Sequence, residues 1–488
     1  MINLESIELK YCPNYEDVFR KLSKLPNLES LRIADIDLGE IPMSVGLLKN
    51  LTSLEFEECR LKKLPDTLTS LVKLEEFSLI NNLFTEIPEV IAEIPSLLKL
   101  NFKKNKIVSF HANFGQNLTF IDLSHNELDS LPLGVIVNST LIELDVADNK
   151  LTSNCLSKLN LPKLEVLNLS RNRIEYLPSS LWDSGEIRIL NLSGNTLSRV
   201  NGLQKLLKLE HVKISGNQIV KLPLGLEKLT KLKLFNLHSN LIEKLPDLIF
   251  HIKNLENIDI SFNKLKALPE FIPSNIVWLA AMENSLKELP LSIGVLTSLE
   301  MLLLNGNDLS SLPKSFGKLA SLKEFQVRMN NISKLPNNFG SLNELIEIDL
   351  GENKFTKYPD LLAKLKNLEH IDIGYNELGL VDFDKIRNPK LNKFECPSCG
   401  IRKISGDTKN NTITELFFYG NSITKLDQFA VLFPNLIELD VSHNSITDIY
   451  SVLPKFKELT ILYITDNPVT EEEVERILID FSEIRIDF

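Results

Sequence analysis

The sequence predicts a solenoid of the α/β class: about 21 repeats stacked into a curved horseshoe, with a parallel β-sheet on the concave face. Short helical or extended segments are expected on the convex face. Three observations predict this fold. An apolar motif returns about every 23 residues, its middle alternates apolar and polar residues, and an asparagine usually follows the alternation.

The motif is LxxLxxLxLxxNxLxxLP, and positions are counted from its first apolar residue. That residue stands at 4, 28, 51, 74, 97, 118, 141, 164, 187, 209, 232, 255, 276, 299, 322, 345, 368, 391, 413, 436 and 459. Because the repeats leave no stretch over, one domain spanning 1–488 is predicted. Residues 1–27 form an N-terminal repeat without a clear cap. Residues 459–488 form a C-terminal repeat with a helix-strand cap that begins at a Thr470–Glu473 capping box.

A short strand is expected in each repeat. Positions four and six are apolar while three, five and seven are mostly polar, which is the period-two alternation of a strand with one buried face. Stacked repeats then share one parallel sheet. The segments between strands are bulkier than a strand, so the sheet should line the inner side of the curve.

Two further positions carry structural signals. Position nine is Asn in 17 repeats and is otherwise Cys12, Ile36, Cys59 or Cys399. An amide can donate and accept at once, so it suits a turn whose backbone groups would otherwise be buried unpaired. Position fifteen is Pro in twelve repeats, where a fixed φ and a missing N–H mark the start of the convex segment.

These residues resemble the leucine-rich repeat family over essentially the whole chain. The repeat at 164 shows the motif in Leu164, Leu167, Leu169, Asn172, Ile174, Leu177 and Pro178. The 23-residue form is similar to intracellular Ras-group and bacterial cytosolic repeat proteins, whereas the repeats from 368 onward are more similar to protein-phosphatase regulatory subunits. The resemblance implies that the asparagines form a ladder through neighbouring repeats, and that signalling is the context.

Composition bounds the partners and the compartment. The formal net charge of −11 lacks the basic stripe that nucleic acid or an anionic membrane surface requires. No segment has the apolar length for membrane insertion, and the N-terminus does not resemble a signal sequence. Five mostly scattered cysteines fit a reducing compartment. A cytoplasmic protein is expected, and its oligomeric state stays open.

No residues with the spacing of a catalytic site are found. The chain has no HExxH, P-loop, GxSxG or Rossmann glycine motif. Cys396 and Cys399 look like half of a zinc site in isolation, but the register places them at core position six and ladder position nine. The sequence therefore predicts no enzyme activity, no metal and no cofactor.

Apolar residues gather on the expected concave face where polar ones are the rule. They are Phe262, Trp278, Ala280, Met282, Met301, Leu303 and Met329. Trp and Met are enriched in binding hot spots, so this apolar patch is a candidate contact surface for a protein partner. The alternative is that position three tucks beneath neighbouring side chains. A weaker aromatic candidate comprises Tyr375, Phe417, Tyr419 and Tyr463.

Carboxylates recur at position five, in Asp122, Asp145, Asp349, Asp372 and Glu395. They predict a solvated acidic stripe that repels acidic partners and attracts basic ones. The leading interpretation is a cytosolic scaffold or regulatory protein that binds a protein partner on its concave face. Two alternatives remain: a regulatory subunit of a cytosolic enzyme such as a protein phosphatase, and a secreted or surface recognition protein.

Overall fold

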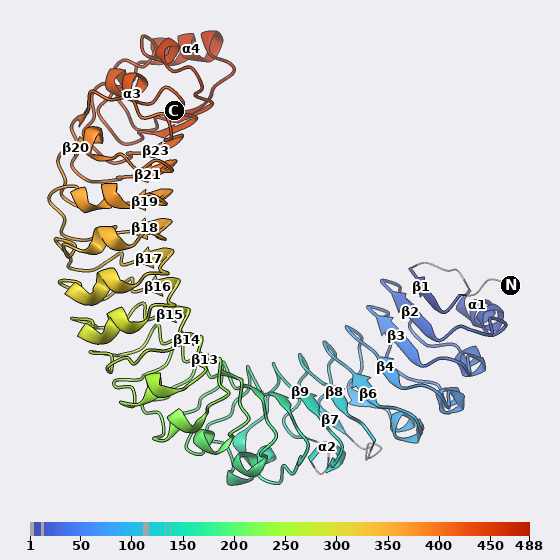
Figure 1. Ribbon diagram of the computed structural model, residues 1–488. Coiled ribbons are helices and arrows are strands. Elements are labelled where there is room, and N and C mark those ends of the chain that lie inside the picture. The colour runs from blue at the N-terminus through green and yellow to red at the C-terminus, as the bar shows by residue number, and fades with distance from the viewer. Residues whose placement is uncertain (1–3, 11–13, 111–116, 132, 137) are drawn as a thin grey trace. The chain divides into compact units, whose positions relative to one another are not determined.

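The computed structural model describes residues 4–10, 14–110, 117–131, 133–136 and 138–488. The chain divides into two compact units, Met1–Leu241 and Ile242–Phe488. Within each unit the strands run along one side and the short helices along the other (Figure 1). Cys12, singled out above, and Pro132, one of the twelve prolines at position fifteen, lie outside the described residues.

The main sheet of the first unit is parallel throughout its described pairings, such as Val166 opposite Glu143 and Ile189 opposite Val166. Its strands are β1 (Ser6–Leu9), β2 (Ser30–Ala34), β3 (Ser53–Glu57), β4 (Glu76–Ser78), β6 (Lys99–Asn101), β8 (Phe120–Asp122), β9 (Glu143–Asp145), β10 (Val166–Asn168), β11 (Ile189–Asn191), β12 (His211–Lys213) and β13 (Leu234–Asn236). A separate two-stranded pairing joins β5 (Glu86–Ile87) to β7 (Ser109–Phe110).

The second unit repeats this arrangement, again with parallel pairings. Its strands are β14 (Asn257–Asp259), β15 (Trp278–Ala280), β16 (Met301–Leu303), β17 (Glu324–Gln326), β18 (Glu347–Asp349), β19 (His370–Asp372), β21 (Lys393–Glu395), β23 (Glu415–Phe417), β24 (Glu438–Asp440), β25 (Ile461–Tyr463) and β26 (Arg485–Asp487). On the helix side β20 (Val381–Asp382) pairs with β22 (Ile404–Ser405).

The predicted register is confirmed strand by strand. A strand begins two residues after the first apolar position of every predicted repeat, as in β16, where Leu299 precedes Met301. The middle residue of β16, Leu302, is fully buried, while Met301 and Leu303 on either side are partly exposed. The alternation therefore assigns position four to the core and positions three and five to the opposite face.

Short helices start directly after several of the position-fifteen prolines, but three residues later after Pro223, Pro246 and Pro336, and the structure shows no helix directly after Pro269. Pro178, for example, directly precedes a 3-10 helix and its carbonyl accepts from Leu181 N–H. The first unit contains α1 (Tyr15–Leu22), η1 (Met43–Leu47), η2 (Asp66–Ser70), η3 (Glu89–Glu93), α2 (Leu133–Ile136), η4 (Ser153–Leu156), η5 (Ser179–Asp183), η6 (Leu203–Lys205) and η7 (Leu226–Lys228). The second contains η8 (Ile249–His251), η9 (Leu291–Val295), η10 (Lys314–Lys318), η11 (Phe339–Ser341), η12 (Asp360–Lys364), η13 (Phe383–Lys385), α3 (Asp427–Leu432), η14 (Leu453–Lys455) and α4 (Glu471–Asp480).

Over the described residues, no helix combines the length and the apolar character that crossing a membrane would need.

The asparagines at position nine form a ladder within each unit. The Oδ1 of Asn149 accepts from Leu128 N–H in the preceding repeat at 2.9 Å. Its Nδ2 donates back to Leu123 O at 3.0 Å and to Val146 O in its own repeat at 3.2 Å. Each amide thus pairs buried backbone groups of two consecutive repeats, which locks their spacing.

Two cysteines replace asparagine in this ladder. The thiol of Cys59 donates to the carbonyls of Ile33 and Glu57, and the thiol of Cys399 donates to those of Ile373 and Pro397. A thiol reproduces the donor half of the amide but only weakly the acceptor half. The prediction that Cys399 occupies a ladder position is confirmed, and Cys396 is fully buried in the core.

The chain ends on a helix and a strand. Thr470 Oγ1 accepts from Glu473 N–H at the start of α4, and β26 pairs with β25. A capping box has two reciprocal hydrogen bonds, and only the one from Glu473 N–H to the Thr470 hydroxyl is formed here. The Glu473 carboxylate instead accepts from the backbone N–H groups of Ile449 and Tyr450 at 2.6 and 2.8 Å, so it ties α4 to the preceding repeat.

Candidate binding surface on the strand face

The strand face is the side of each unit on which positions three and five of the repeats lie. Within the second unit, Trp278 pairs with Met301 and Ala280 pairs with Leu303 on neighbouring strands. Trp278, Met301 and Leu303 are partly exposed. The register therefore brings these four members of the predicted apolar patch together.

The exposure of the patch differs from the expectation at one residue. Ala280 is fully buried, so it supports the surface from below and is not available for contact. Its small side chain is covered because larger neighbours flank it on both strands. Phe262 and Met329 are 46% and 51% exposed, and Met282 is partly exposed. We use the name central patch for Phe262, Trp278, Met282, Met301, Leu303 and Met329.

Phe262 and Met329 sit on an unusual backbone. Both have φ of 55°, in the left-handed region, as do described non-glycine residues at position eight of other repeats, such as Arg171 and His443. Glycine takes the same position at Gly306, with φ of 66°. A bulky residue there costs about 1 kcal/mol in backbone strain. Replacing Phe262 or Met329 by glycine therefore removes an exposed apolar side chain without disturbing the turn.

The acidic stripe is present as two groups of adjacent carboxylates, one in each unit. Asp122 pairs with Asp145 in the first unit, and Asp349, Asp372 and Glu395 pair in succession in the second. The sequence predicted a stripe of carboxylates that contact only solvent, whereas in the structure four of them also bond to the backbone. Asp122, Asp145, Asp349 and Asp372 each accept from a backbone N–H two residues further on.

That bond gives position five a structural role that sequence reasoning missed. It is an Asx-type turn that ends the strand, and Asn168 and Asn191 make the same bond to Ser170 and Ser193. The sequence contains a signal for this turn, because position five is Asp or Asn in many repeats.

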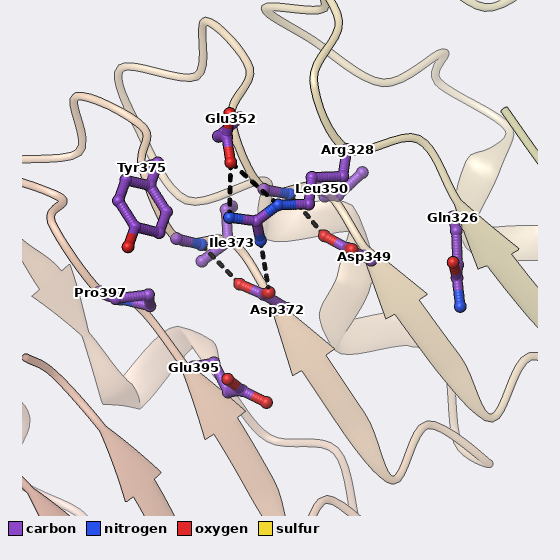
Figure 2. A network of polar contacts seen from close by, with 12 residues as sticks. Gln326, Arg328, Asp349, Leu350, Glu352, Asp372, Ile373, Tyr375, Glu395 and Pro397 are labelled. Atoms are coloured by element: carbon purple, nitrogen blue, oxygen red, sulfur yellow. Dashed lines mark hydrogen bonds and ion pairs between the residues drawn. The ribbon is translucent and has the colours of Figure 1, made fainter. Parts of the chain in front are cut away.

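An arginine crosses the stripe in the second unit (Figure 2). Arg328 Nη1 donates to Asp372 at 3.0 Å, and its Nη2 and Nε donate to Glu352 at 2.7 and 3.1 Å. The guanidinium lies 5.2 Å from the centre of the Tyr375 ring. It passes over Gly351, where an added Cβ would lie 2.6 Å from Nη1. Arg328, which sequence reasoning missed, therefore neutralises part of the stripe.

Glu395 is neutralised in a similar way. It accepts from Lys393 Nζ at 2.7 Å and bonds to His370 Nε2 at 2.8 Å. Burial by itself would lower the pKa of His370, but the hydrogen bond to Glu395 and the nearby acidic charges leave that pKa raised. Within the second unit the strand face therefore carries a network of mixed charge next to the central patch.

The second aromatic set is joined by one direct contact. The hydroxyl groups of Tyr375 and Tyr419 are hydrogen-bonded across two repeats, and their rings meet edge to face. Phe417 lies under the Lys393 ammonium, 5.0 Å from its ring centre. Tyr463 is partly exposed. Both Tyr375 and Phe417 already have cationic neighbours from this chain, which makes them a less available surface than the central patch.

Asp349 sets a pH dependence of stability. Burial, reinforced by the neighbouring Asp372, raises the pKa of its carboxyl to about 6. The folded chain therefore holds this proton more tightly than the unfolded chain, whose pKa is about 4. The contribution of the Asp349 carboxyl to the free energy of unfolding is therefore fully present below about pH 4 and is lost as the pH rises through about 6.

We expect Asp349→Asn to raise the free energy of unfolding at pH 8 by about 1–2 kcal/mol. The amide keeps the bond to Gly351 N–H, as Asn168 does to Ser170, and removes the buried charge. Urea unfolding of both proteins between pH 4 and 8 measures the effect, and their stabilities should converge near pH 4. A gain that is the same at every pH would contradict this explanation.

The first unit has a hollow on its strand face that sequence reasoning missed. About 360 Å³ lies between Glu143 and Asp145 on β9 and His211 and Lys213 on β12, above Val166, Ile189 and other residues of β10 and β11. Burial raises the pKa of both Glu143 and Asp145. The sequence contains a signal for this hollow, because Val166 and Ile189 are apolar at position three, where most repeats have a polar residue.

Among the residues that the structure describes, no group of three or more His, Cys, Asp and Glu side chains is arranged to hold a metal ion. Burial strongly raises the pKa of Cys396, which opposes the thiolate that a metal needs.

Comparisons with known proteins agree with this geometry. Two family models, each described as a leucine rich repeat, match residues 139–197 and 321–378 and residues 434–449. No curated protein matches the chain.

Three solved structures are similar over most of their length. A leucine-rich repeat protein from Leptospira interrogans is 24% identical with a TM-score of 0.56, covering 99% of this chain and 100% of its own. A TDR receptor is 23% identical with a TM-score of 0.67, covering 92% and 82%. The plant peptide hormone receptor RGFR1, solved in complex with RGF2, is 18% identical with a TM-score of 0.62, covering 100% and 91%. At these identities the likeness shows the fold alone.

Proposed function

Because this chain is a leucine-rich repeat protein, we propose that it is a non-catalytic scaffold or regulatory protein that binds a protein partner on its strand face. Repeat solenoids present extended surfaces of this kind, and their function depends on the side chains displayed there. The partner is a protein whose contact surface carries apolar side chains and charges of both signs.

The central patch is the observation that carries this proposal. Trp278 and Met301 lie side by side on neighbouring strands, and Phe262 and Met329 project from strained turns with about half their surface exposed. An exposed apolar cluster containing Trp and Met is the usual composition of a binding hot spot. Burying it would stabilise a complex, whereas leaving it in water favours aggregation.

The surroundings of the patch support a specific partner. Arg328, which follows β17, is bonded to Asp372 on β19, and Asp349 pairs with Asp372 from the neighbouring strand β18. A polar border around an apolar centre excludes partners whose charges do not match. The neighbour RGFR1 was solved with the ligand RGF2, which is consistent with a ligand-binding role for this fold.

We place this function in the cytosol. Cys59 and Cys399 act as thiol donors to backbone carbonyls in the ladder, a role that needs the reduced side chain. Signalling is the context that the intracellular forms of the repeat suggest.

Capture of a partner from cytosol tests the proposal. We expect Phe262→Gly/Met329→Gly to lower capture about tenfold or more, since each truncated hot-spot side chain costs more than 1 kcal/mol of binding. The variant should stay folded because glycine suits both turns. A second variant, Trp278→Ala/Leu303→Asp, should abolish capture.

The matched control is Arg171→Gly/His443→Gly, which makes the same backbone change at position eight outside the central patch. Circular dichroism and thermal melting establish that all variants are folded. Capture lost only in the patch variants would support the strand-face proposal. Equal capture by control and patch variants would rule out the central patch as the binding surface.

A further inference from the structure

A hollow of about 470 Å³ opens on the helix side of the first unit, away from the strand face. It lies between the segments that carry η5 and η6, and its lining includes Tyr176, Trp182, Arg199, Gly202, Gln204 and Lys205. This volume is in the range of ligand sites. The hollow is independent of the surface proposed above for a protein partner.

A buried tryptophan forms one wall. Trp182 is only 6% exposed, and within the described part of the chain its indole N–H has no hydrogen-bond partner. This nitrogen is not among the fully buried side-chain atoms that lack a partner, so solvent in the hollow that Trp182 lines can reach it. A ligand in the hollow can therefore accept a hydrogen bond from Nε1 in place of that solvent.

Gly202 makes room for the indole. Its φ of 110° is accessible to glycine, and an added Cβ would lie 2.4–2.6 Å from Cδ1, Cγ and Nε1 of Trp182. The pyrrole edge of the indole, which carries Nε1, therefore rests against a residue that also lines the hollow. The two residues fit each other because one of them lacks a side chain.

The polar groups of the hollow are mainly donors and cations. Gln204 uses its Oε1 to accept from Gly202 N–H, which leaves its NH₂ group for a ligand. Over the described residues Arg199 makes no ion pair, and the ammonium of Lys205 reaches only the exposed Asp183, at 3.8 Å. No carboxylate lines the hollow. Its charge therefore favours an anion.

The remaining wall favours a ring. The Tyr176 side chain is 46% exposed, and its hydroxyl donates to Asn154 Oδ1 at 2.9 Å, which holds the ring in place. Leu177 adds apolar surface beside it. A fixed aromatic face next to an indole edge suits a stacked or edge-on aromatic ligand.

We propose that this hollow binds an aryl phosphate, with its ring against Tyr176 and its phosphate oxygens bonded by Arg199, Lys205 and the Trp182 indole N–H. A phosphate monoester carries close to two negative charges at neutral pH, which two cations balance better than they would balance a carboxylate. The volume exceeds what a bare phosphate fills. The chemistry is shared by a free small molecule and by a phosphotyrosine side chain of another protein.

The fluorescence of Trp182 can report ligand binding in the hollow, because the residue lines it. The chain has two tryptophans, so Trp278→Phe leaves Trp182 as the only one. Titrating this 488-residue variant with phenyl phosphate should give a saturable change in Trp182 fluorescence. Benzoate and inorganic phosphate should bind about tenfold more weakly or worse, because each lacks one half of the ligand. A phosphotyrosine peptide that binds more tightly than phenyl phosphate identifies a protein source; weaker binding identifies a small molecule.

The variants decide whether the hollow is the site. Arg199→Gln/Lys205→Gln should weaken phenyl phosphate binding about tenfold or more, since both charges are exposed and their loss should not affect folding. Arg173→Gln/Lys228→Gln removes the same charge outside the hollow and should leave binding unchanged. The proposal is overturned if phenyl phosphate gives no saturable change, or if both double variants bind it equally. Thermal melting of each variant excludes unfolding as the cause.

Discussion

Asn307→Leu is expected to lower the free energy of unfolding by about 4 kcal/mol, the largest effect of the single substitutions considered. Asn307 is 7% exposed. Its Oδ1 accepts from Leu286 N–H at 3.0 Å, and its Nδ2 donates to Ala281 O and Leu304 O at 2.9 and 3.0 Å. Leucine has a similar size but cannot bond, so three backbone groups would be buried unpaired at about 1–3 kcal/mol each.

Two further variants check this explanation by urea unfolding. Asn307→Cys should cost about half as much as the leucine variant, because Cys59 and Cys399 show that a thiol can donate at this position. Asn343→Leu, at an exposed position, should have little effect. If Asn307→Leu and Asn343→Leu had equal effects, the ladder would not be the source of stability.

Arg328→Met is expected to lower the free energy of unfolding at pH 8 by about 2–3 kcal/mol. The side chain of Asp372 is 14% exposed, and that of Arg328 is 27% exposed. Removing the guanidinium leaves a poorly solvated carboxylate without its cation, next to Asp349. The cost is below that of a fully buried pair because both groups reach some solvent.

The pH profile separates lost charge from lost packing. Burial already raises the pKa of Asp372, and losing Arg328 should raise it further. The deficit of the variant should therefore vanish at low pH and grow as the pH rises through the folded-state pKa of Asp372, which lies above its usual value. Arg328→Met/Asp372→Asn should recover most of the stability, since an amide keeps the bond to Gly374 N–H.

A matched control comes from the first unit. Arg188 also bridges two carboxylates, Glu165 and Glu210, but its side chain is half exposed. Arg188→Met should change stability little, because solvent screens exposed pairs. A pH-independent deficit in Arg328→Met, or no recovery in the double variant, would show that the arginine acts by packing alone.

Local patterns determined the repeat. The alternation of apolar residues located the start of the main-sheet strand in each repeat, as with Leu299 before Met301. Pro178 marked the start of η5, and Asn149 marked a rung of the ladder. These features follow from side-chain periodicity, fixed φ and amide hydrogen bonding, and each needs only the residues of one repeat and its neighbour. The neighbours of Trp278 on the strand face followed from the same register.

Tertiary structure decided what that register leaves open. Ala280 is buried because of the size of its cross-strand neighbours, and Arg328 reaches Asp372 across two repeats and 44 residues of sequence. Trp182 closes over Gly202 from the preceding repeat. Exposure, charge pairing and hollows depend on side-chain directions and on contacts between distant segments, whereas a repeat motif specifies only which face each residue occupies.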